Sequence, residues 1–311
     1  MDAMNAGAFD GIVGQPQAVK ILTRAIALQK LAPAYLFAGV AGVGKRTTAR
    51  AFIQAITGKV RHPDVLWVEP TYMDRGKLLT PKEAEEVGLK RKTSPQIRIE
   101  QIREVADFLS RPPLFSERSL VVIESAETMA ESAGNALLKT LEELGRATVI
   151  LIAPAEVSLL PTLVSRCQKV PFYRLALADM QLILAKVLPP DSAVALPHTL
   201  LLQAEGSIGN ALQAYKHLQA IPPELLPSPE HVPKTAIAAM ELAKSIASLD
   251  LEAQLWLADY WQNWLWEKYP MPAPITILEQ TKQHLHNFVQ PRLAWEVALI
   301  NLAHLVFLEN F

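Results

Sequence analysis

Hydrophobic and polar positions follow two periods along the first half of the chain. Short uninterrupted apolar runs are typical of strands that are buried on both faces. They stand at 35–38, 64–68, 119–123 and 148–152. Between them, apolar residues three and four positions apart predict helices. These helices span 15–31, 47–57, 97–109 and 132–144. Because the two kinds of segment alternate, the pattern predicts a parallel α/β sheet covered by helices on both faces.

The second half of the chain has a helical pattern throughout. Short helices are indicated from about 176 to 220, and longer ones at 251–269 and 291–311. Between them, residues 221–233 contain five prolines in thirteen positions, which predicts a linker because proline cannot continue a helix. We therefore expect four parts in sequence: an α/β domain, a small helical domain, a proline-rich linker and a second helical domain. Their boundaries are 1–175, 176–221, 222–233 and 234–311.

The segment 58–96 departs from the alternating pattern, and its stretch at 70–96 is rich in charged and turn-forming residues. We interpret it as an exposed insertion or a flexible loop. Lys90, Arg91 and Lys92 could touch nucleic acid, but three basic residues are weak evidence. A solvated loop without a specific task is the interpretation we prefer.

The composition is that of an ordinary globular protein. Half of the 311 residues are hydrophobic, a fifth are charged, and the net charge is −1, so no global feature indicates a nucleic-acid-binding protein. The single cysteine, Cys167, excludes an internal disulfide and a four-cysteine zinc site. We find no signal peptide and no apolar run of about 18 residues, the length of a membrane span. We expect a cytoplasmic protein without membrane contact.

The stretch "GVAGVGKRTT" at 39–48 almost matches the phosphate-loop pattern G-x-x-x-x-G-K-[ST], and it lies between a predicted strand and a predicted helix. Gly39, Gly42 and Gly44 would let backbone N–H groups turn inward around an anion, and Lys45 would reach the β- and γ-phosphates. The alternative is a glycine-rich turn without a ligand. The strand–loop–helix context argues against a chance match, and whether ATP still binds stays open.

Arg46 breaks the pattern at the residue whose hydroxyl group should bind magnesium. Thr47 comes one residue late, which rotates it by about 100° around the helix. At the end of the strand 119–123, Glu124 could lie near a metal ion, or it could be a simple polar strand end. Ser125 follows where an acidic residue should orient water, and serine is a poor base. Hydrolysis needs both the metal and the base, so this site looks degenerate.

Several motifs, taken in order, resemble one family. They are "FDGIVG" at 9–14, the phosphate loop, "IESAETM" at 123–129, "NALLKTLEE" at 135–143 and "LLPTLVSRCQKVPF" at 159–172. Together they are similar to the clamp-loader branch of the AAA+ ATPases, and within it to the delta-prime group of bacterial DNA polymerase III. The resemblance covers residues 9 to about 215, and "NFVQPRLAWEVAL" at 287–299 extends it into the C-terminal domain.

The resemblance implies a fold and a set of partners. The fold is an AAA+ P-loop domain with a parallel sheet, followed by a small helical lid and an all-α collar domain through which five subunits form a ring. The implied partners are gamma/tau-type ATPase subunits and a delta subunit and, through the complex, the sliding clamp and primed DNA. Many relatives carry a cysteine-rich zinc module, but with one cysteine this chain is expected to bind no zinc.

The resemblance also assigns a role to Arg166. In this family the Ser-Arg-Cys motif, here Ser165–Cys167, supplies an arginine finger in trans to the ATP site of a neighbouring motor subunit. Active motors also carry a lid arginine, where this chain has Gly209, and a polar sensor residue, which the strand at 149–154 lacks. These departures, with Arg46 and Ser125, affect only the chain's own ATP site.

We therefore expect a non-hydrolysing subunit that acts as a stator, requires no cofactor, binds ATP weakly or not at all, and has Arg166 as its catalytic contribution. The first alternative is an active AAA+ ATPase with an atypical phosphate loop that uses Thr47 and Glu124. The second is a scaffold in which Arg166 is merely structural. Arg46 could lie over the phosphate pocket or form an ion pair with Glu124. The tryptophans at 256–266 are expected to pack between helices or subunits rather than to stack on nucleic acid.

Overall fold

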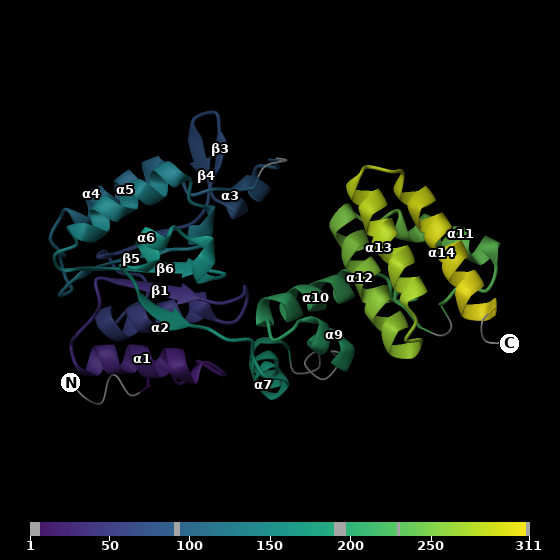
Figure 1. Cartoon of the computed structure of the whole chain (residues 1–311), viewed down its shortest axis with the longest axis horizontal. Helices are drawn as coiled ribbons and strands as arrows, with labels where there is room; N and C mark the ends of the chain where they lie inside the picture. Colours follow the sequence, from purple (N-terminus) through teal and green to yellow (C-terminus); the bar gives the residue numbers. More distant parts are fainter. Residues whose placement is uncertain (1–6, 90–93, 190–196, 229–230, 309–311) are drawn as a thin grey trace. The chain divides into compact units, whose positions relative to one another are not determined.

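The computed structural model describes residues 7–89, 94–189, 197–228 and 231–308, so the basic run at 90–92 lies outside the described residues. The chain forms two compact units, Met1–Ile183 and Leu184–Phe311 (Figure 1). Their boundary falls within helix α7 (Leu177–Val187), and each unit is described by itself. Among the described residues, no helix is both long enough and apolar enough to cross a membrane.

A five-stranded sheet forms the centre of the first unit, and every strand pair in it is parallel, as predicted. The order of the strands is β2-β5-β6-β1-β7. Their bounds are β1 Ala34–Ala38, β2 Val65–Val68, β5 Ser119–Ile123, β6 Ala147–Ala153 and β7 Gln168–Pro171. The sequence pattern missed β7. This edge strand exposes Gln168 and Lys169, so it lacks the apolar run by which the central strands were recognised.

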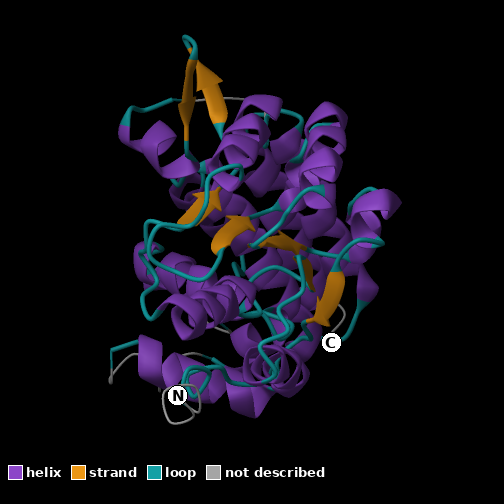
Figure 2. Cartoon of the chain, turned by 90° about the vertical axis from the view of Figure 1, so that its left-hand side faces the viewer, coloured by secondary structure: helices purple, strands orange, loops and turns teal. Residues whose placement is uncertain are grey.

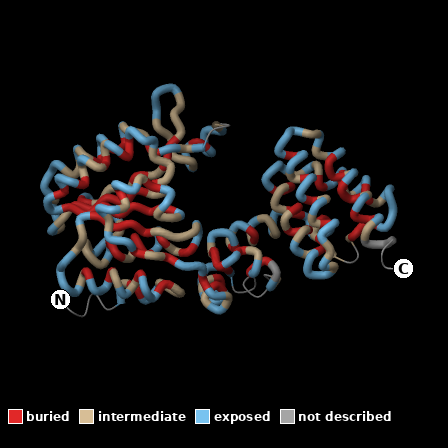
Figure 3. The backbone as a smooth tube through the Cα atoms, viewed as in Figure 1, coloured by how far each residue is buried: buried red, intermediate tan, exposed pale blue. Residues whose placement is uncertain are grey.

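Helices cover both faces of this sheet (Figure 1). One face packs against α4 (Ile99–Leu109) and α5 (Glu131–Glu142), and the other against α1 (Pro16–Ala27) and α2 (Lys45–Thr57). Successive residues of a strand point to opposite faces, so the buried strands contribute side chains to two hydrophobic cores, one on each face of the sheet. Figure 3 shows these buried residues within the unit. Shorter helical segments lie at Ala126–Thr128, Glu156–Ser158 and Pro161–Val164, the last of which is α6.

The predicted loop within 58–96 contains regular structure. Strands β3 (Tyr72–Asp74) and β4 (Lys77–Leu79) form an antiparallel hairpin, followed by the short helix α3 (Pro81–Glu86), and Figure 2 shows the hairpin projecting from the sheet. Both turn residues, Arg75 and Gly76, have positive φ, as a tight hairpin turn requires. Strands of three residues are too short to produce a periodic pattern. The helix did carry a signal, because Thr80 and Glu83 form a capping box.

The second unit is entirely helical in its described part. Its helices are α9 His198–Gln203, α10 Ile208–Ala220, α11 Ala236–Ile246, α12 Leu251–Lys268, α13 Pro272–His286 and α14 Pro291–Leu308, with a short helical turn at Pro223–Leu225. Helices α9 and α10 belong to the same compact unit as α11–α14. The division of this region into lid, linker and collar stays a prediction.

Tryptophan packing in this unit follows the expectation. Trp261 is fully buried and donates its indole N–H to the carbonyl of Leu225 at 3.1 Å. Trp256 stacks between His217 of α10 and Tyr260, with ring centroids 5.1 and 5.2 Å apart. Packing between helices is therefore confirmed for Trp261 and Trp256. The contact of Trp256 with His217 joins α12 to α10.

Candidate functional site

The phosphate loop runs from the end of β1 to the start of α2, and its glycines are required by the backbone. Gly42 and Gly44 have φ of 75° and 100°, a left-handed conformation that side chains disfavour. At Gly39, an added Cβ would collide with the backbone carbonyl of Phe172, which follows β7. These glycines therefore allow a loop backbone that residues with a side chain would strain, and phosphate binding by the loop stays a prediction.

A buried glutamine that the sequence analysis missed holds this loop in place. Gln15, only 2% exposed, donates from its amide nitrogen to the carbonyls of Val43 (3.2 Å) and Tyr173 (2.7 Å). Its amide oxygen accepts the N–H of Tyr173 at 3.0 Å. The side chain thus ties the start of α1 to the phosphate loop and to the segment after β7. Gln15 directly precedes helix α1, where a polar residue is usually interpreted as a helix cap. Its immediate sequence therefore did not indicate that it contacts the phosphate loop.

Lys45 is turned back onto its own loop. The residue is 8% exposed, and its amine donates to the carbonyls of Gly39 and, at 2.7 Å, Val40. Burial lowers the pKa of Lys45 to about 8, although the charge of Glu127 acts in the opposite direction. The loop's own carbonyls therefore take the hydrogen bonds that a phosphate would receive, and a ligand would have to displace them.

Arg46 bridges two carboxylates at the carboxyl edge of the sheet. It donates to Oε1 of Glu69 at 2.6 Å, and its Nε lies 2.9 Å from Oε1 of Glu124. The ion pair with Glu124 is the alternative that the sequence left open, and it is confirmed. The contact is an ion pair rather than an aligned hydrogen bond, because Oε1 of Glu124 has no hydrogen-bond partner. Burial raises the pKa of Glu124, and the Arg46 charge opposes that rise.

Strand register explains why these carboxylates meet. Val68, the last residue of β2, pairs with Ile123, the last residue of β5. Glu69 and Glu124 follow directly, and parallel strands place their carboxyl ends at one edge. Sequence analysis missed Glu69, although its position directly after an apolar run was the same signal that identified Glu124.

These residues do not fit a magnesium–nucleotide complex. The guanidinium of Arg46 already supplies the positive charge between Glu69 and Glu124. A divalent cation could bind between these carboxylates only by displacing the guanidinium. Thr47 is exposed on the first turn of α2, and Ser125 has a left-handed φ of 48°. Within the described ranges, no group of three or more His, Cys, Asp or Glu residues could hold a metal ion.

Arg166 lies apart from the phosphate loop, on the turn between α6 and β7. Its guanidinium donates to Oε1 of Glu142 at 2.7 Å and to the carbonyl of Thr162 at 3.1 Å. The Arg166 side chain is 42% exposed, and that of Glu142 is 56% exposed. The arginine thus stands at the surface, with a solvent-accessible carboxylate at the end of α5 and a backbone carbonyl of α6 as its partners. Sequence analysis did not identify Glu142 as that partner.

The other predicted departures lie in two different units. Gly209 is in the first turn of α10, after the N-cap residue Ser207, whose side chain accepts the N–H of Asn210. Val149–Ala153 belong to β6, where every residue is buried. Gly209 therefore belongs to the second unit and the phosphate loop to the first. The part of the strand that lies in β6, Val149–Ala153, has only apolar side chains.

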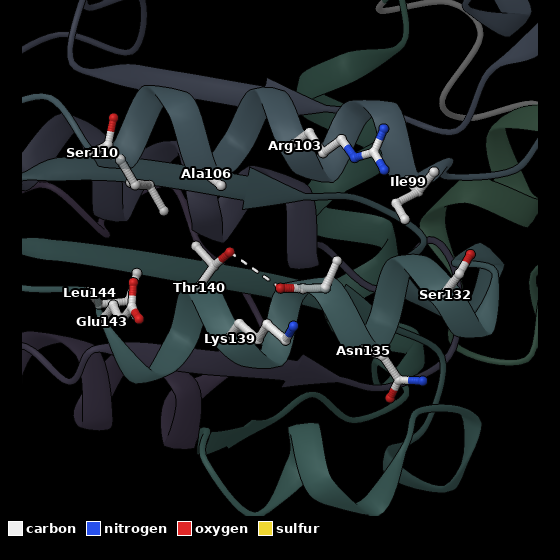
Figure 4. Close-up of a pocket in the computed structure, with 12 residues that line it drawn as sticks. Ile99, Arg103, Ala106, Ser110, Ser132, Asn135, Lys139, Thr140, Glu143 and Leu144 are labelled. Atoms are coloured by element: carbon white, nitrogen blue, oxygen red, sulfur yellow. Dashed lines mark hydrogen bonds between the residues drawn. The ribbon is translucent and has the colours of Figure 1, made fainter.

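A pocket of about 550 Å³ lies between α4 and α5 (Figure 4). Arg103, Ser132, Asn135 and Lys139 contribute to its lining, and no residue of the phosphate loop does. The pocket is a surface groove between two helices, so it does not enlarge the phosphate site.

Comparison with known proteins places the chain in a family. Residues 14–176 match a family described as "DNA polymerase III, delta subunit", and residues 178–302 match "Cyanobacterial DNA polymerase III delta prime, C-terminal domain".

Individual relatives agree with these matches. The DNA polymerase III subunit delta′ of Pseudomonas aeruginosa is 33% identical over 252 residues, which cover 75% of this chain and 70% of the relative. The subunit delta′ of Bacillus subtilis is 32% identical over 51% of this chain and 47% of its own length. The tau subunit of the same organism is 30% identical, and the match spans 54% of this chain and 29% of the relative.

The fold is shared with a solved structure. The DNA polymerase III gamma subunit-related protein from Thermotoga maritima superposes with a TM-score of 0.52 at 18% identity, over 93% of this chain and 98% of that chain. The expected AAA+ P-loop fold is confirmed by this likeness and by the parallel sheet. On both family matches and on its relatives, this chain belongs to the delta-prime family of DNA polymerase III subunits.

Proposed function

We propose that this chain is a non-hydrolysing subunit of a clamp loader and that Arg166 completes the ATP site of a neighbouring subunit in trans. One contrast carries the proposal. Arg46 stands at the chain's own magnesium position and pairs with two carboxylates, one of which, Glu124, is only 14% exposed, whereas Arg166 pairs with a single carboxylate that is 56% exposed. The first arrangement obstructs the use of the chain's own nucleotide, and the second holds its cation loosely enough to be exchanged.

The chemistry required of Arg166 is electrostatic. A guanidinium placed against the γ-phosphate stabilises the negative charge that develops as the phosphoryl group leaves. An exposed arginine–carboxylate pair contributes only about 0.2–1 kcal/mol, so Arg166 can exchange Glu142 for a phosphate at low cost. Glu142 keeps the side chain near the surface of α5 until that exchange.

The relatives support a set of partners. The tau subunit that resembles this chain is the kind of ATPase neighbour whose site Arg166 would enter. A delta subunit would stand elsewhere in the ring, and the assembled complex would place a sliding clamp on primed DNA in the cytoplasm. In this arrangement the chain serves as a stator against which the ATP-driven subunits move.

The purified chain tests the first half of the proposal. We expect no magnesium-dependent ATP turnover above a no-protein blank and no saturable ATP binding by calorimetry up to the millimolar range, because Arg46 and the folded-back Lys45 occupy the site. Robust turnover, or a micromolar dissociation constant for ATP, would favour an active ATPase with an atypical phosphate loop.

A further inference from the structure

A second pocket, of about 450 Å³, lies beside the phosphate loop and shares Arg46 with it. It is formed by α2, the loop after α2 and the edge strand β2. The residues that give it chemical character are Arg46, Arg50, Arg61, His62 and Trp67, and two valines complete the wall. The pocket is open to solvent, so an occupant would enter it from solution.

Two of the three arginines in this pocket are available to a ligand. Arg46 is neutralised by Glu69 and Glu124. Arg50 and Arg61 are exposed, and neither forms a close ion pair within the part of the chain that the structure describes, although the Arg50 charge also opposes the rise in the pKa of Glu124. The guanidinium of Arg50 lies 5.8 Å from the centroid of the Trp67 ring. The pocket therefore presents two unpaired cations next to an aromatic surface.

An apolar pair stands next to these cations on a rigid loop. Leu114 and Phe115 are each 76% exposed. The buried carboxylate of Asp64 accepts the N–H groups of Leu114, Phe115 and Ser116 and the hydroxyl of Ser116, at 2.7–2.9 Å. Burial raises the pKa of Asp64, but these four hydrogen bonds outweigh it and bring the pKa to about 2. The rings of Phe115 and of His62, a pocket residue, form a T-shaped pair with centroids 6.3 Å apart.

The loop therefore holds two large hydrophobic side chains in water at the border of a cationic pocket. Exposed apolar side chains on a backbone that is already hydrogen-bonded in place bind a partner without the entropy cost of ordering a flexible loop. Arginine and aromatic residues are also the types enriched where proteins bind one another.

We propose that this surface, defined by Arg50, Arg61, Trp67, Leu114 and Phe115, binds an acidic segment of a partner protein that carries at least one large apolar side chain. Its carboxylates would pair with the two arginines, whose planar guanidinium groups match a carboxylate bidentately. Its apolar side chain would cover Leu114 and Phe115.

Nucleic acid is the less suitable occupant. Its affinity for proteins grows with the number of phosphate groups neutralised, and two unpaired arginines supply few such contacts. Leu114 is aliphatic and offers no face for base stacking. The inference goes beyond the proposed function, because it involves neither Arg166 nor a nucleotide.

Fluorescence anisotropy with the full chain tests this site. The probes are labelled twelve-residue peptides that combine two to four Asp or Glu residues with Leu or Phe at every spacing. We expect saturable binding in the micromolar range for at least one spacing, and at least tenfold weaker binding of its Asn/Gln counterpart. Arg50→Glu with Arg61→Glu should weaken binding at least tenfold, and so should Leu114→Ser with Phe115→Ser. Arg24→Glu, an exposed arginine on α1, is the matched control and should bind as the unchanged chain does.

Thermal melting establishes that each variant is folded. The inference is overturned if no peptide in the set saturates below millimolar concentration, or if the amide counterpart or the variants bind equally well. Tighter binding of a single-stranded oligothymidylate, lost in the same variants, would overturn it in favour of nucleic acid. None of these outcomes alters the expected behaviour of Arg166 variants, so the two proposals fail separately.

Discussion

Replacing Arg166 with alanine is expected to lower ATP hydrolysis at one neighbouring site of a reconstituted clamp loader by about 1,000-fold, the lower end of the effect of an arginine finger. The cause is the loss of the guanidinium that would face the γ-phosphate. The measurement is single-turnover hydrolysis in complexes whose other ATPase subunits carry inactivated phosphate loops, so that only the neighbouring site reports.

Three matched variants interpret the result. Arg166→Lys keeps the charge but loses the planar fork, so it should recover only part of the rate. Arg146→Ala removes an exposed arginine near the same end of α5 and should leave the rate unchanged. Glu142→Gln removes only the surface ion pair, so hydrolysis should persist. If Arg166→Ala assembled normally and hydrolysed ATP at the unchanged rate, the arginine would be structural and the chain a scaffold.

Replacing Arg46 with threonine is expected to create magnesium-dependent ATP binding in a chain that otherwise lacks it. The change restores a hydroxyl at the metal position and leaves Glu69 and Glu124 without their shared cation, so that a divalent ion can take its place. We expect a dissociation constant at least about 100-fold below the millimolar limit at which the unchanged chain shows no saturation, or about 2.8 kcal/mol, measured by calorimetry with and without magnesium. Hydrolysis should stay slow, because Ser125 still occupies the position of the acidic residue.

Arg50→Thr is the control for this variant. Arg50 lies one turn further along α2. The guanidinium groups of Arg46 and Arg50 are equally close to Trp67, each 5.8 Å from the ring centroid. Within the described part of the chain, however, no carboxylate forms a close ion pair with Arg50. Equal ATP affinity in the Arg46→Thr and Arg50→Thr variants would mean that the ion pair does not close the site.

Much of the fold could be predicted because the central strands are buried on both faces. Such strands must be continuous apolar runs, as at Ser119–Ile123, where the predicted and observed bounds agree. Strands with fewer buried residues were not predicted. Edge strand β7 shows only one fully buried residue, and the hairpin strands are three residues long. The predicted helix at 97–109 begins at Ile99, because Ile97 instead forms a β-bridge with Met129.

The candidate site was predictable where local spacing carries the chemistry. The ten residues 39–48 alone show the glycines of the phosphate loop and the departure at Arg46. Gln15 was not found, because its role depends on contact with Tyr173, 158 positions away. Glu69 follows an apolar run, as Glu124 does, but its pairing with Arg46, 23 positions away, could not be predicted from that position. Only the strand register and the tertiary packing bring such residues together.

The position of Arg166 in the assembled complex tests the central claim most directly. The measurement is the structure of the reconstituted loader bound to ATP or to an analogue of its transition state. We predict that the Arg166 guanidinium leaves Glu142 and lies about 3 Å from a γ-phosphate oxygen held by a neighbouring subunit, a normal hydrogen-bond distance. An Arg166 that stays paired with Glu142 and faces no subunit's nucleotide would contradict the account.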